Sequence, residues 1–290
     1  MSSPHGSHKT EQPNTYFVQD RQSKEELTRL TIQERLVTTA MGGVLAEQAD
    51  PSIFRRVLDI GCGPGGWIVE AAQTYPTMSL VGIDISQRMI DYAHAQAAAH
   101  NVADRIELRV MDALRTLDFP SATFDLVNLR FGVSYIRTWD WPRLLGEIMR
   151  VLRPGGVIRL TEPEIIQHSN SVALTRLYEM LLCALYRSGH LYAQESNGLT
   201  VHLEPLLTRY GCQQVAAKTC TIAYQGGTEE GQSYYEATKQ GTLGPFIQKW
   251  GCAPENYDDL FQQALNDMQQ PTFHITWNIL TVWGTSPRPA

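Results

Sequence analysis

The chain has 290 residues, of which 43% are hydrophobic and 19% are charged, and this composition is typical of a globular protein with a substantial core. Its formal net charge of −6 disfavours a broad nucleic-acid-binding face, because such faces are basic, so we expect no nucleic-acid partner. No apolar run approaches the ~20 residues that span a bilayer, and the first residues lack the apolar core of a signal peptide. We therefore expect a cytoplasmic protein that does not associate with membranes.

Five cysteines stand at wide spacings, and none belongs to a C-x-x-C pair: Cys62, Cys183, Cys212, Cys220 and Cys252. An odd number without motif spacing is typical of reduced thiols rather than of a disulfide framework. The sequence also has no His/Cys/Asp cluster at metal-ligand spacing, so we expect no metal site.

The first segments indicate an arm followed by a helical cap. Residues 1–15 are rich in Ser, His, Gln and Pro and contain almost no apolar residues, which predicts a disordered arm. From Ser23 to about Ala46, apolar residues recur at three- and four-residue spacing, which predicts a helix. We assign residues 16–50 to a helical cap.

A glycine-rich stretch follows the first predicted strand. Residues 55–60 are predicted to form the first strand, with an apolar run that starts at Val57. The pattern then breaks into Gly61-Cys62-Gly63-Pro64-Gly65-Gly66 and restarts as a helix to about residue 75. Glycines at the end of a strand let backbone N–H groups approach a ligand, because no Cβ holds the ligand away. The stretch therefore predicts a cofactor cradle.

Two cofactor classes are compatible with this cradle. The glycine pattern Gly61-x-Gly63-x-x-Gly66, with Asp84 at the end of the second predicted strand, also satisfies the dinucleotide fingerprint. In either class, Asp84 would accept hydrogen bonds from two ribose hydroxyls. Asp59 distinguishes them, because an acid at that place would face a positively charged group such as an amino-acid ammonium rather than a pyrophosphate.

The stretch from Val57 to Gly66 resembles motif I of the class I S-adenosylmethionine (SAM) methyltransferases, and Leu152-Arg153-Pro154-Gly155-Gly156 resembles another of their hallmarks. The resemblance covers roughly residues 55–165 and points to the small-molecule, type 11-like members. It implies that SAM is the cofactor. It also implies cofactor contacts for Asp59, Gly61, Gly63, Asp84, Ile85, Met89, Asp112, Ala113, Asn128, Leu129 and Arg130.

The resemblance assigns parts of SAM to some of these residues. Asp59 and the glycine backbone would hold the methionine part. Ile85 and Met89 would lie on the two faces of the adenine. The Asp112 carboxylate would accept from the adenine N6 amine, and the next backbone N–H, that of Ala113, would reach a ring nitrogen. An acid at the end of the third strand is not part of the dinucleotide fingerprint, so Asp112 favours SAM.

The acceptor is expected to be a small molecule. The carboxyl end of the fourth strand lies beside the sulfonium in this family, which implies that Phe131 and Tyr135 contact the acceptor. Tyr16 in the cap and Tyr186 in an aromatic-rich helical segment, 171–188, are further candidates. The Asn/Asp-Pro-Pro-aromatic motif of enzymes that methylate DNA or protein amides is absent here. We therefore expect an apolar or aromatic organic acceptor.

Methyl transfer from SAM is an in-line displacement that depends mainly on positioning and on exclusion of water. A hydroxyl acceptor or an alkene carbon would in addition need a general base. The candidates near the end of the fifth strand are Glu162, which we rank first, and His168, with Glu164 beside them. His190 and His202 lie further along the chain.

The order of elements predicts an α/β fold: a Rossmann-like, seven-stranded, mostly parallel sheet with helices on both faces and an antiparallel C-terminal strand pair. We expect a single domain over residues 16–290. Its parts would be a core at 51–165, helical lid insertions at 166–197 and 229–270, and C-terminal strands at 213–224 and 272–285.

Two other functions remain open from the sequence. An NAD(P)-dependent oxidoreductase is disfavoured by Asp59, Asp112 and the C-terminal strand pair. A SAM-binding regulator without turnover would carry the same cofactor motifs. The residues specify neither whether carbon, oxygen or nitrogen is methylated nor whether the chain forms a homo-oligomer.

Overall fold

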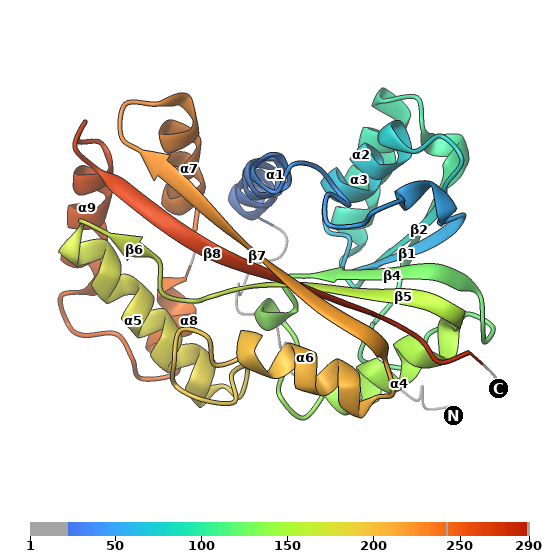
Figure 1. Cartoon of the computed structure of the whole chain (residues 1–290). Coiled ribbons are helices and arrows are strands. Elements are labelled where there is room, and N and C mark those ends of the chain that lie inside the picture. The colour runs from blue at the N-terminus through green and yellow to red at the C-terminus, as the bar shows by residue number, and fades with distance from the viewer. Residues whose placement is uncertain (1–22, 242, 289–290) are drawn as a thin grey trace, which may run out of the picture.

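The computed structural model describes residues 23–241 and 243–288, and Figure 1 shows their arrangement. The expected disordered arm at 1–15 and the candidate Tyr16 lie outside the described residues. The described chain begins with helix α1 (Lys24–Ala40), followed by the short 3-10 helix η1 (Pro51–Ile53). The Ser23 side chain caps α1 by accepting from the backbone N–H of Glu26 at 2.9 Å.

Strands and helices then alternate, as the sequence pattern predicts. In chain order they are β1 (Arg56–Ile60), α2 (Gly66–Thr74), β2 (Ser79–Asp84), α3 (Gln87–Ala99), η2 (Ala103–Arg105), β3 (Ile106–Val110), β4 (Phe124–Arg130), η3 (Gly132–Ser134), α4 (Trp141–Val151) and β5 (Leu152–Pro163). The order changes beyond β5. The remaining elements are β6 (His168–Ser169), α5 (Val172–Arg187), α6 (Thr200–Arg209), β7 (Gln213–Gln225), α7 (Glu229–Lys239), α8 (Gly244–Lys249), α9 (Tyr257–Met268) and β8 (His274–Thr285).

The strands form one sheet in the order β3-β2-β1-β4-β5-β8-β6, with β7 paired to the other side of β8. Strands β1 to β5 pair in parallel, and β8 runs antiparallel to β5, β6 and β7. The predicted fold class is confirmed, and the two-residue β6 is added to the seven expected strands. Because β1 lies between β2 and β4, the strand order reverses beside β1. In open α/β sheets, ligands bind at the carboxyl ends of the strands at this reversal.

The parallel strands are buried on both faces, which explains their nearly continuous apolar sequence. On one face, Val57 packs in a cluster with Trp67 of α2. On the other face, Leu58 packs in a cluster with Leu144 and Ile148 of α4, whose apolar residues recur at helical spacing. None of the described helices is long and apolar enough to cross a bilayer.

The antiparallel pair β7–β8 extends beyond the parallel part of the sheet. Strand β5 follows β8 only as far as Pro163 opposite Ile279, whereas β7 continues to Gln225 opposite His274. Figure 1 shows α5, α7, α8 and α9 gathered around this projecting end of the hairpin. Helix α1 lies between α2 and α7 and contacts both. Four of the helices that follow β5 therefore surround the end of the hairpin, whereas α6 packs against β5, β7 and β8.

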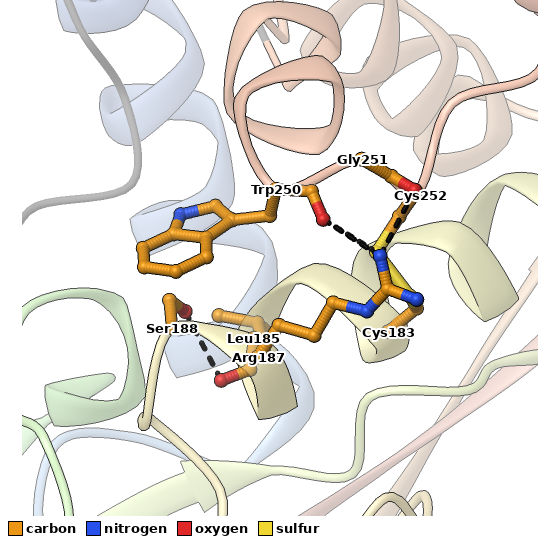
Figure 2. The surroundings of a disulfide bond; sticks show 7 residues. All are labelled: Cys183, Leu185, Arg187, Ser188, Trp250, Gly251 and Cys252. Carbon is orange, nitrogen blue, oxygen red and sulfur yellow. Dashed lines mark hydrogen bonds between the residues drawn. A yellow bond between two sulfur atoms is a disulfide. The ribbon is translucent and has the colours of Figure 1, made fainter.

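Two cysteines join helices at this end of the molecule. Cys183 of α5 and Cys252, which follows α8, form a disulfide with a Cα–Cα distance of 6.1 Å. Beside it, Arg187 donates to the backbone carbonyls of Trp250 and Gly251 at 2.9 and 3.0 Å (Figure 2). The expectation of five reduced cysteines is therefore wrong for this pair. The packing of α5 against α8 brings these cysteines together, and a sequence separation of 69 residues carries no motif that reveals it.

We expect the double substitution Cys183→Ser with Cys252→Ser to lower the free energy of unfolding by about 4 kcal/mol. The disulfide closes a loop of about 70 residues, and the chain-entropy relation gives a stabilisation of this size for such a loop. Urea unfolding of both proteins, with and without reductant, measures the effect. Cys220→Ser, which changes a free and half-buried thiol, is the matched control and should unfold close to wild type. A wild-type midpoint that is insensitive to reductant would contradict the prediction.

Candidate active site

A cavity of about 320 Å³ lies at the carboxyl ends of β1, β2 and β4 and continues to the projecting end of the β7–β8 hairpin. We call its two parts the cofactor end and the aromatic lobe. The cofactor end is lined by residues that include Asp59, Gly61, Gly63, Asp84, Ile85, Met89, Asp112 and Ala113. The aromatic lobe is lined by residues that include Leu177, Tyr178, Leu181, Tyr224, Tyr234, Ile247, Tyr257, Phe261 and Trp277.

The glycine loop after β1 has a backbone shape that favours glycine. Gly61 and Gly63 have φ values of +68° and +51°, in the left-handed region. A Cβ at Gly61 would lie 2.7 Å from the hydroxyl of Tyr135, whereas a Cβ at Gly63 would point into open space. The loop therefore leaves room for a ligand to approach its backbone at Gly63.

The acid at the end of β2 fixes this loop. The Asp84 carboxylate accepts from the backbone N–H of Gly63 at 3.1 Å and from that of Ser86 at 2.8 Å. One side chain thus joins the glycine loop to the start of α3. Asp84 also lines the cavity.

A buried row of polar side chains crosses three neighbouring strands. Asp59, Asn128 and Arg159 stand opposite one another in the register of β1, β4 and β5. Asn128 donates to Asp59 Oδ1 at 2.8 Å and accepts from Arg159 Nη1 at 2.8 Å. Arg159 also binds both carboxylate oxygens of Glu47, at 2.7 and 3.2 Å. The segment between α1 and β1 thus supplies the counter-charge of a buried arginine.

The net pKa shifts of Asp59 and Glu47 have opposite directions. Burial raises the pKa of Asp59 to about 7, although the Asn128 hydrogen bond and the Arg159 charge oppose it. Burial also acts to raise the pKa of Glu47, but pairing with Arg159 outweighs it, and the pKa ends below its usual range. Glu47 is thus held as a carboxylate, whereas Asp59 is poised to change its charge near neutral pH.

The third strand ends beside the remaining part of the cofactor end. Asp112 accepts from the backbone N–H of Leu114 at 2.9 Å and forms an ion pair with Arg115 at 3.4 Å. Met89 is buried and Ile85 is half exposed, and both line the cavity. Three acids, from β1, β2 and the segment after β3, therefore meet at this end of the cavity.

Comparisons with known proteins agree with this geometry. Residues 57–156 match a family described as a methyltransferase domain. The match begins in β1 and ends within β5. The matched residues include the glycine loop and the three acids at the cofactor end, Asp59, Asp84 and Asp112.

Curated relatives match over part of their length. A demethylmenaquinone methyltransferase of Deinococcus radiodurans is 39% identical over 108 residues, which are 37% of this chain and 43% of that protein. Aklanonic acid methyltransferase DauC of Streptomyces sp. (strain C5) is 37% identical over 129 residues, 43% of this chain and 56% of the relative. The chain thus spans about half the length of these relatives.

A solved structure shares the fold over most of the chain. It is Haemonchus contortus phosphoethanolamine N-methyltransferase 2 in complex with phosphomonomethylethanolamine and S-adenosylhomocysteine. The TM-score is 0.57 at 19% identity, covering 94% of this chain and 60% of that one. At this identity the likeness concerns the fold.

Three residues around the end of β4 in the methyltransferase domain face the cavity. Arg130 forms an ion pair with Glu34 of α1 and donates to Thr38 at 3.1 Å, and burial lowers its pKa to about 9. Phe131 has a φ of +56° at the start of η3, and its ring stacks on Trp277 at 6.0 Å. The Tyr135 hydroxyl is buried without a hydrogen-bond partner among the described residues. An unpaired donor beside the glycine loop fits a ligand held there.

Two predicted cofactor contacts on β4 lie outside the cavity. Asn128 belongs to the buried row behind Asp59, and Leu129 belongs to the core on the opposite face. Side chains alternate along a strand, so neighbouring residues cannot both face the same layer. The Asn128 side chain therefore lies beside Asp59 and that of Leu129 in the core, while their contacts with a cofactor stay predictions.

The two predicted bases do not line the cavity either. Glu162 is fully buried and accepts from the backbone N–H groups of Gly132 and Val133 at 2.6 and 3.0 Å. Burial raises its pKa to about 8, and this outweighs the two backbone hydrogen bonds. Alternation along β5 turns Glu162 to the face of Leu160, where it holds the start of η3. His168 is exposed on the edge strand β6.

The predicted acceptor contact Tyr186 is 43% exposed and lies outside the cavity lining. Tyr178, Leu181 and Leu185 of the same helix line the cavity at spacings of three and four residues. Tyr186 follows Leu185 directly and is rotated by about 100° around the helix axis. Tyr178 shares a helix face with Leu181 and Leu185, so helical spacing in the sequence favours Tyr178 over Tyr186 as the tyrosine that lines the cavity.

We expect Glu47→Gln to destabilise the fold by about 3–5 kcal/mol, because it leaves the Arg159 charge buried without its counter-charge. Chemical unfolding at neutral pH measures the loss. Glu107→Gln is the matched control, because Glu107 pairs with Arg109 at the surface, where such pairs contribute about 0–1 kcal/mol. Equal losses in the two variants would contradict the assigned role of the buried row.

Proposed function

We propose that this chain is a SAM-dependent methyltransferase that methylates a small apolar or aromatic organic molecule. The observation that carries the proposal is one cavity that joins a glycine loop with three acids to an aromatic lobe. The methyltransferase domain at 57–156 supports the reaction class. The names of the relatives, which concern demethylmenaquinone and aklanonic acid, support a small organic acceptor.

The residues at the cofactor end fit SAM. The Asp59 carboxylate would meet the ammonium of the methionine part, and the open backbone at Gly63 would let that part approach the loop. Asp84 would accept from the ribose hydroxyls, and Asp112 from the adenine amine. When bound, SAM would supply an electrophilic methyl group. The unpaired hydroxyl of Tyr135, beside Gly61, would then gain a polar partner.

The side chains around the cavity favour catalysis by positioning. Burial raises the pKa values of the lining residues Tyr178 and Tyr257 to about 12, so these phenols stay neutral near pH 7. Glu164 lines the cavity and accepts from Asn278 at 3.1 Å, so it is one of the carboxylates in the cavity wall. Among the described residues, no group of three or more His, Cys, Asp and Glu is arranged to hold a metal ion. The walls would align acceptor, methyl and sulfur and exclude water.

Location and partners belong to the same proposal. The net charge of −6 supports a protein without a nucleic-acid partner. The Cys183–Cys252 disulfide weighs against the cytoplasmic location expected from the sequence, because disulfides are rare in a reducing compartment.

The proposal is tested first by calorimetric titration of the full chain with SAM, S-adenosylhomocysteine and NADH. We expect the first two to bind and NADH not to bind. Asp84→Ala should weaken SAM binding about 10- to 150-fold, because it removes charge-assisted hydrogen bonds worth about 1.5–3 kcal/mol. Asp118→Ala changes an exposed acid and should bind SAM as wild type does. Binding of NADH alone would overturn the proposal.

A SAM-binding protein without turnover would also pass this titration. Methyl transfer from radiolabelled SAM to a panel of ring-containing acceptors distinguishes the two, because a regulator would give no labelled product with any acceptor. We expect labelled product with wild type and a much reduced yield with Asp84→Ala at a SAM concentration near the wild-type Kd.

SAM affinity should depend on pH through Asp59. Below its pKa of about 7 this acid is protonated in the free protein, so pairing with the SAM ammonium requires loss of a proton. Affinity should therefore fall by up to about tenfold per pH unit as the pH drops below 7, with proton release on binding. Titrations between pH 5.5 and 7.5 in buffers of different ionisation enthalpy measure both. Asp59→Asn should bind more weakly at pH 7.5 and lose this slope; a slope retained in the variant would refute the assignment.

A further inference from the structure

Three polar side chains form a hydrogen-bonded chain in the wall of the aromatic lobe. The hydroxyls of Tyr178 in α5 and Tyr234 in α7 are 2.6 Å apart, and Tyr234 donates to Gln167 Oε1 at 2.7 Å. All three residues line the cavity, and Gln167 and Tyr234 are buried. This chain is a connected polar point in a wall that consists mainly of leucines and aromatic rings.

The chain has a direction. An amide oxygen can only accept, so the proton of the Tyr234 hydroxyl is used toward Gln167. Tyr178 must then donate its own proton to Tyr234. The Tyr178 oxygen has lone pairs left to accept another hydrogen bond. The end of the chain in the lobe therefore offers an acceptor and matches a ligand group that donates.

Both phenols remain protonated at neutral pH. Burial raises the pKa of Tyr178 to about 12 and that of Tyr234 well above its usual value. A neutral phenol accepts a hydrogen bond without removing the ligand's proton. The pair therefore orients a ligand and does not act as a general base.

Flat aromatic surfaces surround this polar point. The ring of Tyr224 stacks on that of Tyr234, with centroids 4.8 Å apart and planes 19° apart. Tyr257 and Phe261 of α9 form a second nearly parallel pair, with planes 7° apart. Parallel rings in the wall favour a flat aromatic ligand, because offset stacking with such walls adds to burial.

We infer that the aromatic lobe binds a ring compound through a hydroxyl that donates to the Tyr178 oxygen, and that Tyr178, held by Tyr234, selects for this hydroxyl. The inference deepens the proposed function, since it rests on the lobe being the acceptor site. It defines the substrate class as hydroxylated aromatic molecules. Tyr178 is a specificity-determining residue in this scheme, and Tyr234 is a positioning residue.

The test uses three probes that share the naphthalene ring and differ in one substituent: 1-naphthol, 1-methoxynaphthalene and naphthalene. Each is titrated into the full chain in the presence and absence of S-adenosylhomocysteine. Wild type should bind 1-naphthol about threefold to tenfold more tightly than the other two, as expected for one hydrogen bond to a buried partner. Tyr178→Phe should abolish this preference and retain the affinity for naphthalene, which also shows that the variant is folded.

Two further variants sharpen the test. Tyr234→Phe should reduce the preference, because the Tyr178 hydroxyl loses the acceptor that fixes its proton. Tyr192→Phe removes a hydroxyl that donates to the Thr138 carbonyl outside the cavity and should leave the preference unchanged.

Equal affinity of wild type for 1-naphthol and 1-methoxynaphthalene would overturn the inference. A preference that persists in Tyr178→Phe would overturn it as well, and so would the failure of all three probes to bind wild type. These outcomes are independent of the cofactor titration. A chain that binds 1-naphthol through Tyr178 but does not bind SAM would disprove the proposed function and retain the hydroxyl site.

Discussion

The buried ion pair between Arg159 and Glu47 is the interaction on which the cofactor end depends. A charged guanidinium inside the sheet is costly unless it is paired, and Glu47 from the segment after α1 pairs with it through two oxygens. Asn128 accepts a hydrogen bond from Arg159 and donates one to Asp59, so the position of the arginine also fixes that of the Asp59 carboxylate. The orientation of one site acid is therefore set by a residue outside the parallel sheet.

The two ends of the cavity have different structural origins. The cofactor end consists of strand ends and the loops that follow them, where parallel strands meet at the reversal of strand order. The aromatic lobe consists of helices that follow β5, gathered around the part of the β7–β8 hairpin that extends beyond the parallel sheet (Figure 1). Phe131 and Trp277, whose rings stack where the two ends join, connect the methyltransferase domain to the hairpin.

The sequence predicts the features that depend on local order. Glycines after a strand and acids at strand ends, such as Asp59 and Asp84, follow from hydrophobic pattern and spacing. Features that depend on long-range packing could not be predicted. The Cys183–Cys252 bond joins segments 69 residues apart, and the contact of Tyr178 with Tyr234 spans 56 residues. The position of Glu162 outside the cavity lining depends on the face of β5 to which its side chain points, and the sequence pattern does not reveal that face.

The disulfide has a topological consequence for this half of the molecule. Cys183 and Cys252 close a covalent ring that contains all of α6, β7, α7 and α8, and therefore one strand of the hairpin that carries the aromatic lobe. A single backbone cut inside this ring, for example in the turn between β7 and α7, would open the ring without releasing a fragment. The two pieces would stay joined through sulfur and would separate only after reduction, so the lobe could tolerate a nick that would divide a chain without this bond.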